Sequence, residues 1–118
     1  MPCGISRGAG LAVIVLCAFI AVTGPSPAAV TTILGAGTLS CGQWTEKRDF
    51  DHAYMLSWVL GFMSANNQWM KKDLTSGTDS AGLEAWIGNY CSAHPLDALA
   101  VAASNLAVEL ATRQGLLK

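Results

Sequence analysis

The clearest hydrophobic pattern in the chain lies between Leu83 and Cys91. Its apolar positions recur at steps of three and four residues, which is the spacing of one face of an α-helix. They are Leu83, Trp86, Ile87, Tyr90 and Cys91. Asp79 or Ser80 can cap the start of this helix, and we expect it to end over residues 92–94. The pattern therefore predicts an amphipathic helix that holds Cys91 on its buried face.

A second helical pattern precedes this one. Its stripe consists of Tyr54, Trp58, Phe62 and Ala65, and it is widened by Met55, Val59 and Met63. We expect the helix to begin near Asp49 or Asp51, either of which can be the N-cap, and to end before Asp73. Gly61 lies inside it, where glycine costs about 1 kcal/mol relative to alanine. We therefore expect Gly61 to allow a close approach by another helix or by a tryptophan.

A third helix is predicted to follow the stretch that ends at His94. Pro95 suits its first position, and Asp97 suits its first turn, where negative charge is favourable. Its apolar face consists of Leu96, Leu99, Ala103, Leu106 and Leu110, with Ala100 and Ala107 beside them. Gly115 is the expected stop.

The first residues of the chain have the pattern of an export signal. One positive charge, Arg7, precedes an apolar run over residues 9–22, which is shorter than the roughly 20 residues of a membrane-spanning helix. Breakers occupy residues 23–27, and small residues then suit cleavage after Ala28 or Ala29. We therefore expect a signal peptide at residues 1–28 and a periplasmic or secreted protein; an uncleaved membrane anchor is the alternative.

Two segments follow the predicted cleavage site. Residues 29–40 are rich in Gly, Thr and Ser, and we expect a flexible N-terminal arm that is either extended or disordered. Residues 41–115 are expected to form the helical domain. At its start, residues 41–48 can make a helical turn that points Trp44 inward.

Charge excludes two classes of partner. Past residue 28 the chain has six basic and eight acidic residues, which gives a net charge of −2. A nucleic-acid-binding domain would carry a basic patch, and a peripheral membrane protein would carry a polybasic segment. We therefore expect no nucleic-acid partner and no membrane contact after signal cleavage, and the oligomeric state is left open.

Cys41 and Cys91 are the two cysteines that remain after the leader, with Cys3 and Cys17, is removed. In an exported chain two cysteines most simply form one disulfide, and two free thiols are the alternative. The bond closes a loop of fifty residues, worth about 4 kcal/mol in the chain-entropy estimate. About ninety residues bury only a modest core, so this crosslink matters to stability.

The sequence offers little catalytic chemistry. A zinc site usually has four ligands, whereas the mature chain has only His52 and His94 and the cysteines are expected to be oxidised. No nucleophile elbow, phosphate-binding loop, Cys-x-x-Cys pair or haem attachment motif occurs in the sequence. We therefore expect no metal, no cofactor and no catalytic residue, so that the protein is not an enzyme.

The tryptophans are the candidates for a binding surface. We expect most of them to fill the core, where aromatic side chains supply much of the buried area. Trp69 is the exception, because it stands beside Met70 and is followed by Lys71 and Lys72. We therefore interpret Trp69 and Met70 as a possible interaction surface.

Four motifs support a resemblance over most of the mature chain. They are Ser40-Cys41-Gly42-x-Trp44, Trp58-x-x-Gly61-Phe62, Gly77-Thr78-Asp79 and Trp86-Ile87-x-x-Tyr90-Cys91-x-x-His94-Pro95-Leu96-Asp97. With these motifs the chain resembles a group of small exported proteobacterial proteins. More loosely, its layout resembles two periplasmic groups, the HdeA-type acid-stress chaperones and the Rap/Tai-type immunity proteins that neutralise secreted toxins.

The resemblance implies a periplasmic protein that acts by binding protein, either a client or a toxin, and it transfers no catalytic residue. It also implies that Trp86, Tyr90, His94, Pro95 and Asp97 form a structural motif. Together with the helical patterns, we expect an all-α protein: a small three- to four-helix orthogonal bundle closed by one disulfide. Its expected role is HdeA-like and stress-protective, and toxin immunity is the alternative.

Overall fold

The computed structural model describes residues 24, 32–46 and 48–118 of the chain. Apart from residue 24, the predicted signal peptide, its cleavage site and the start of the predicted arm lie outside the described residues. The architecture below concerns the unit that contains residues 32–118.

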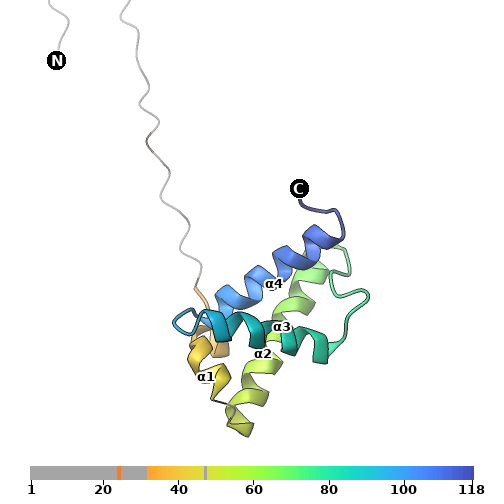
Figure 1. Cartoon of the computed structure of the whole chain (residues 1–118). Coiled ribbons are helices and arrows are strands. Elements are labelled where there is room, and N and C mark those ends of the chain that lie inside the picture. The colour runs from red at the N-terminus through yellow and green to blue at the C-terminus, as the bar shows by residue number, and fades with distance from the viewer. Residues whose placement is uncertain (1–23, 25–31, 47) are drawn as a thin grey trace, which may run out of the picture. The chain divides into compact units, whose positions relative to one another are not determined.

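The unit is all-helical, as predicted, with one short 3₁₀ helix and four α-helices (Figure 1). They are η1 Gly35–Thr38, α1 Cys41–Thr45, α2 Asp49–Met70, α3 Ser80–Ala93 and α4 Leu99–Arg113. Helix α2 packs mainly on α4 and η1, whereas α3 packs on α1 and α4. In Figure 1, α3 runs across the other two long helices. Helix α4 therefore contacts every other element and lies at the centre of the bundle.

Helix α3 confirms the clearest sequence pattern. Asp79 is its N-cap, and the Asp79 carboxylate accepts a hydrogen bond of 2.8 Å from the backbone N–H of Gly82. Leu83, Ile87 and Cys91 are buried, while Trp86 and Tyr90 are half-buried at the edges of the apolar face. The helix ends at Ala93, within the predicted range.

Helix α2 corrects part of the prediction. It begins at Asp49 and ends before Asp73 as expected, but Arg48 is the N-cap position, so Asp49 and Asp51 lie in the first turn instead of capping. The buried face consists of Met55, Val59 and Met63, whereas the sequence pattern places these residues at the margin of the apolar stripe. Apolar side chains surround more than half of this helix, so periodicity alone does not identify the buried side.

The stripe expected at the centre of the α2 face lies at its edge. Tyr54 is 47% exposed, Ala65 is exposed, and Trp58 and Phe62 are half-buried. Gly61 is exposed, and a Cβ at this position would have nothing within 4 Å, so the predicted close approach there is wrong.

A close approach to Trp58 does occur, at Gly37 in η1, a segment to which the sequence assigned no element. Trp58 Nε1 donates a hydrogen bond of 2.8 Å to the carbonyl oxygen of Leu34. A Cβ built on Gly37 would overlap the Trp58 ring, so only glycine lets the backbone lie this close. In the described part of the expected arm, residues 32–40, Ala36 and Gly37 are buried.

The connection between α3 and α4 differs from the prediction, because α4 starts at Leu99. Pro95 and Asp97 therefore precede the helix instead of forming its first turn, and Leu96 is 95% exposed instead of lying on the apolar face. The backbone here is paired with the segment before α1. The N–H groups of Cys41 and Gly42 donate to the carbonyls of Asp97 and Pro95, at 2.8 and 2.9 Å.

Helix α4 otherwise matches its pattern. Its buried residues are Leu99, Ala100, Ala102, Ala103, Leu106, Leu110 and Ala111. Gly115 ends it with a φ of 70°. The N–H of Gly115 donates to Thr112 and that of Leu116 to Ala111, each at 2.9 Å, which is the Schellman arrangement.

The predicted disulfide is present. Cys41 and Cys91 are bonded with an S–S distance of 2.08 Å, and both residues are fully buried beside Trp44, which is 2% exposed. The bond joins the start of α1 to the end of α3. Within the described residues, no helix combines the length and apolar character needed to cross a membrane.

Replacing both cysteines tests how much the disulfide contributes to stability. The double variant Cys41→Ala/Cys91→Ala removes a crosslink between residues fifty positions apart, so the unfolded chain gains conformational entropy. We therefore expect the free energy of unfolding to fall by about 4 kcal/mol. Urea unfolding followed by tryptophan fluorescence measures it. A loss below about 1 kcal/mol would contradict a stabilising role for the bond.

Candidate functional site

The two residues predicted to form an interaction surface are at the end of α2. Trp69 is 88% exposed and Met70 is 38% exposed. An indole this exposed leaves a large apolar area in water, which is unusual unless another molecule covers it. The sequence correctly placed both residues on the surface, but it did not show what surrounds them.

Met70 lies at one end of a shallow apolar trough that follows α4. The trough consists of two adjoining hollows of about 260 and 310 Å³, and Ser104 and Val108 line both. Its large apolar side chains are Ile33, Phe62, Met70, Val101, Val108 and Leu117. Val108 is 54% exposed. We call this feature the α4 trough.

The α4 trough is less polar than its composition suggests. Asn66, Ser104 and Asn105 line it, yet each donates a side-chain hydrogen bond to a carbonyl four residues earlier in its own helix. These bonds are 2.8 to 2.9 Å long. Among the described residues that line the trough, none is ionisable. The trough therefore offers an apolar, uncharged surface.

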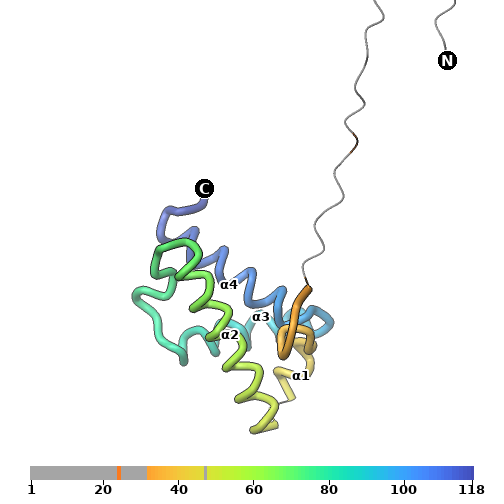
Figure 2. Tube along the Cα trace, turned by 180° about the vertical axis from the view of Figure 1, so that it is seen from behind, coloured from red at the N-terminus to blue at the C-terminus, as the bar shows by residue number. Residues whose placement is uncertain are grey.

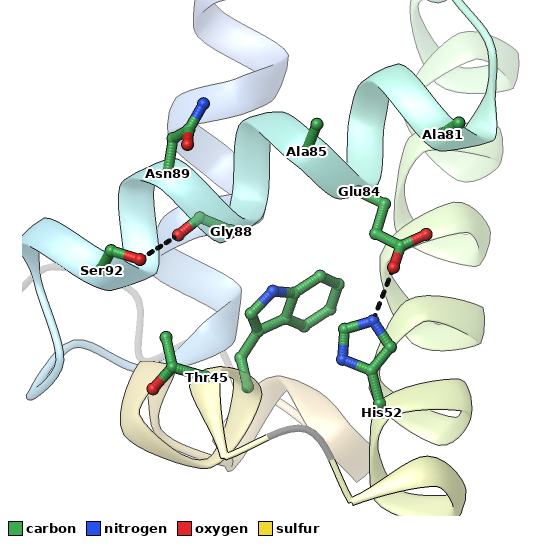
Figure 3. A pocket seen from close by; sticks show the side chains of 9 residues that line it. Thr45, His52, Ala81, Glu84, Ala85, Gly88, Asn89 and Ser92 are labelled. Carbon is green, nitrogen blue, oxygen red and sulfur yellow. Dashed lines mark hydrogen bonds and ion pairs between the residues drawn. The ribbon is translucent and has the colours of Figure 1, made fainter.

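A second hollow, of about 450 Å³, lies between α1, the start of α2 and α3 (Figure 3). His52 Nε2 and Glu84 Oε1 are 2.8 Å apart, which links α2 to α3 across 32 residues of sequence. The His52 ring also packs on Trp44, with centroids 4.5 Å apart. His52 Nδ1 is buried without a hydrogen-bond partner.

The hydroxyl groups that line this hollow donate to backbone carbonyls. His52 has an acidic partner, but the hydroxyls of Thr45 and Ser92 donate to the backbone carbonyls of Gly42 and Gly88 instead of approaching the imidazole. Within the described residues no group of three His, Cys, Asp or Glu side chains is placed to hold a metal ion. The contact between His52 and Glu84 therefore acts as a brace between helices. This contact could not be predicted from the sequence, because no short-range pattern relates these two positions.

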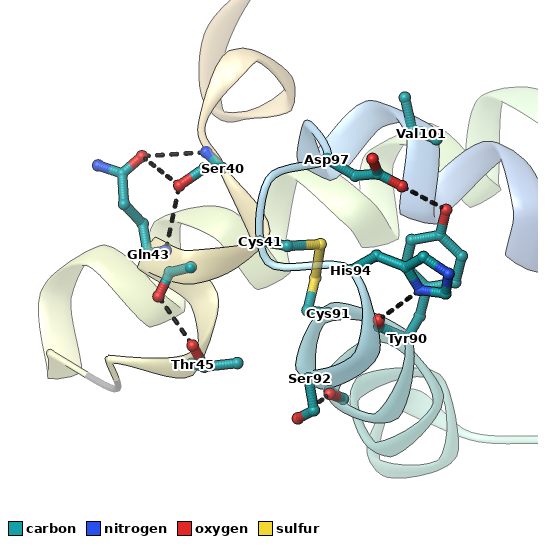
Figure 4. The surroundings of a disulfide bond; sticks show 12 residues. Ser40, Cys41, Gln43, Thr45, Tyr90, Cys91, Ser92, His94, Asp97 and Val101 are labelled. Carbon is teal, nitrogen blue, oxygen red and sulfur yellow. Dashed lines mark hydrogen bonds between the residues drawn. A yellow bond between two sulfur atoms is a disulfide. The ribbon is translucent and has the colours of Figure 1, made fainter.

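Three of the residues expected to form a structural motif, Tyr90, His94 and Asp97, lie near the disulfide (Figure 4). Along α3 the rings of Trp86, Tyr90 and His94 stack, with centroids 5.7 and 4.3 Å apart. The Tyr90 hydroxyl donates a hydrogen bond of 2.7 Å to Asp97 Oδ2. His94 Nδ1 lies 3.0 Å from the carbonyl oxygen of Tyr90.

These contacts fix the loop between α3 and α4. Pro95 and Asp97 are held to α1 through their backbone carbonyls, and Asp97 is also held to α3 through Tyr90. Leu96, between them, points into solvent at 95% exposure. The loop therefore exposes one apolar side chain, Leu96, on a backbone that these hydrogen bonds hold in place.

Tyrosine ionisation tests this brace. The hydrogen bond to Asp97, and then desolvation and the negative charge of Asp97, raise the pKa of Tyr90 above its ordinary value near 10. Because the pKa of Tyr90 is raised in the folded protein, its hydrogen bond to Asp97 stabilises the fold below pH 10. This stabilisation is lost as the pH rises through the raised pKa.

We expect a spectrophotometric titration of the Tyr54→Phe variant, in which Tyr90 is the one remaining tyrosine, to show phenolate at higher pH than free tyrosine. Adding Asp97→Ala should lower that midpoint, whereas Asp97→Asn, which keeps an acceptor but removes the charge, should lower it less. Identical midpoints in all three proteins would show that Asp97 does not hold the hydroxyl.

No protein-family model, no curated protein and no solved structure matches this chain. Its function is therefore inferred from its own residues.

Proposed function

We propose that this protein is exported and acts, without catalysis, by binding other protein chains in the α4 trough, in a protective role like that of the HdeA-type chaperones. One observation carries the proposal: an uncharged apolar trough lies open along α4 in the folded protein. Contiguous exposed apolar surface on a small domain is typical of a protein-interaction site.

The shape of the trough favours a protein segment over a small molecule. Its lining on α4 extends from Ala100 to Ala111, about 16 Å at 1.5 Å per residue. That length matches about three turns of helix or five residues of extended chain. A small-molecule site usually adds a few precisely placed polar groups, whereas the polar side chains here are bonded to their own helices.

The trough is open in the folded state, so binding does not require the protein to unfold. Only 13% of the residues are charged, which leaves few groups whose titration could drive an acid-induced transition. We therefore expect protection of client proteins at neutral pH as well as at acid pH.

Toxin immunity is the second candidate, and Leu96 is the observation that favours it. A single leucine at 95% exposure on a loop braced by a disulfide and by Tyr90 suits one dedicated partner. A rigid anchor side chain loses little entropy on binding, which favours a specific and tight complex.

One substitution series separates the two roles. Val108→Glu places a carboxylate in the trough, where covering it with an apolar segment would leave a buried unpaired charge. We expect this variant to suppress the aggregation of heat-denatured citrate synthase at least about tenfold less well per mole, corresponding to about 1.4 kcal/mol. Asn89→Glu, which adds the same charge on α3, should behave as the unmodified protein. Light scattering measures both.

Equal suppression by the Val108→Glu and Asn89→Glu variants would contradict the protective role of the trough. The immunity alternative makes the opposite prediction for cells that co-express a toxin encoded beside the gene. There Leu96→Asp should abolish protection and Val108→Glu should leave it intact.

A further inference from the structure

Three lysines directly follow residues that line one end of the α4 trough. Lys71 and Lys72 directly follow Met70, and Lys118 directly follows Leu117; Met70 and Leu117 both line that end. All three lysines are exposed. Within the described residues none of them forms an ion pair. Lys118 is more than forty residues from Lys71 and Lys72 in the sequence, so only the fold brings these parts of the backbone to the same end of the trough.

The ends of α2 and of the chain are held together by Gln114. Its side-chain nitrogen donates to the carbonyl oxygens of Asp73 and Leu74, both at 2.9 Å. Leu74 is 1% exposed, so this contact ties the C-terminal turn to the core. Figure 2 shows the end of α2 and the C-terminal tail at the same end of the molecule.

The negative groups near this end take part in hydrogen bonds or ion pairs within the protein. Asp73 Oδ1 accepts hydrogen bonds from Asn67 and from both the N–H and the hydroxyl of Thr75. Glu109 is paired with Arg113 at 2.7 Å. Lys71, Lys72 and Lys118 carry three positive charges against the one unpaired carboxylate of Asp73, so this end is positive, although the chain as a whole is slightly acidic.

The other end of the trough has no such charge. Its lining there consists of Ile33, Ala100, Val101 and Asn105, none of which is ionisable. The trough is therefore apolar and uncharged along its length, with lysines beside one end only. A complementary ligand is therefore apolar along its length and negatively charged at one end only.

We propose that the occupant of the α4 trough is an apolar protein segment that carries acidic residues at one end, and that these acidic residues meet Lys71, Lys72 and Lys118. This inference rests on the proposed function, because it assigns the chemistry of the partner at the same surface. The apolar side chains provide burial, and the charges set the direction in which the segment lies. Trp69, which precedes Met70 in the chain, is 88% exposed.

A hollow surface favours a segment over a membrane. A bilayer docks on apolar side chains that protrude beyond their surroundings, whereas Val108 and Phe62 line a recess between helices. Three lysines alone also give only weak attraction to an anionic bilayer.

Three synthetic helical peptides of 14 residues with one common apolar face test the proposal. One has three Glu at its N-terminal end, one has three Glu at its C-terminal end, and one has three Gln. We expect one acidic peptide to bind the protein at least about tenfold tighter than the Gln peptide at low salt, measured by fluorescence anisotropy. The difference should shrink in 0.5 M salt, because screening weakens exposed charge pairs.

Paired variants separate the lysines from the trough. Lys71→Gln/Lys72→Gln should remove the preference for the acidic peptide. Gln43→Glu/Asn89→Glu changes the net charge by the same amount on α1 and α3, and should keep the preference. Val108→Glu should weaken the binding of all three peptides.

The outcomes distinguish this inference from the function on which it rests. If all three peptides bind equally and Val108→Glu weakens them, the acidic partner is wrong and the trough stands as a protein-binding site. If no peptide binds, both proposals fail. Binding to vesicles of anionic phospholipid in place of the peptides, or a stable dimer that hides Val108, would also overturn the acidic segment as the occupant.

Discussion

The structure depends on the joint between the segment before α1 and the corner between α3 and α4. Cys41 is bonded to Cys91, and the N–H groups of Cys41 and Gly42 donate to the corner's carbonyls. Leu99, the first residue of α4, donates back to the carbonyl of Leu39 at 2.8 Å. One covalent bond and three backbone hydrogen bonds therefore set where α1 lies, where α3 ends and where α4 begins.

This joint explains why α4 is central and why one of its faces is uncovered. Once its start is fixed against α1, α4 lies between α2 and α3, and its alanines allow all three helices to approach closely. Among the described residues, Val101 and Val108 on the outer side of α4 stay about half exposed. The open trough is therefore a consequence of the same arrangement that builds the core. We propose that the trough serves as a binding surface.

The sequence predicted what local patterns determine and missed what tertiary contacts decide. Asp79, Gly115 and the face of α3 follow from capping and periodicity, and the disulfide follows from cysteine count and export. Pro95 and Asp97 suited a helix start, but pairing with Cys41 and Gly42 holds them in an extended corner.

The buried side of α2 was misplaced because Tyr54 and Met55 are both apolar and only packing distinguishes them. For the candidate site, exposure of Trp69 could be inferred from its lysine neighbours. The trough and the approach of the C-terminal turn to the segment after α2 could not, since they depend on long-range contacts such as those of Gln114 with Asp73 and Leu74.

Amide hydrogen exchange of the oxidised protein tests the role of the joint most directly. The amides of Cys41, Gly42 and Leu99 stand outside or at the very start of helices, where N–H groups usually exchange fast. If the joint organises the fold, they exchange as slowly as the core of α4, and all of these amides lose protection together when the disulfide is reduced. Fast exchange at these three amides while α4 stays protected would contradict the account.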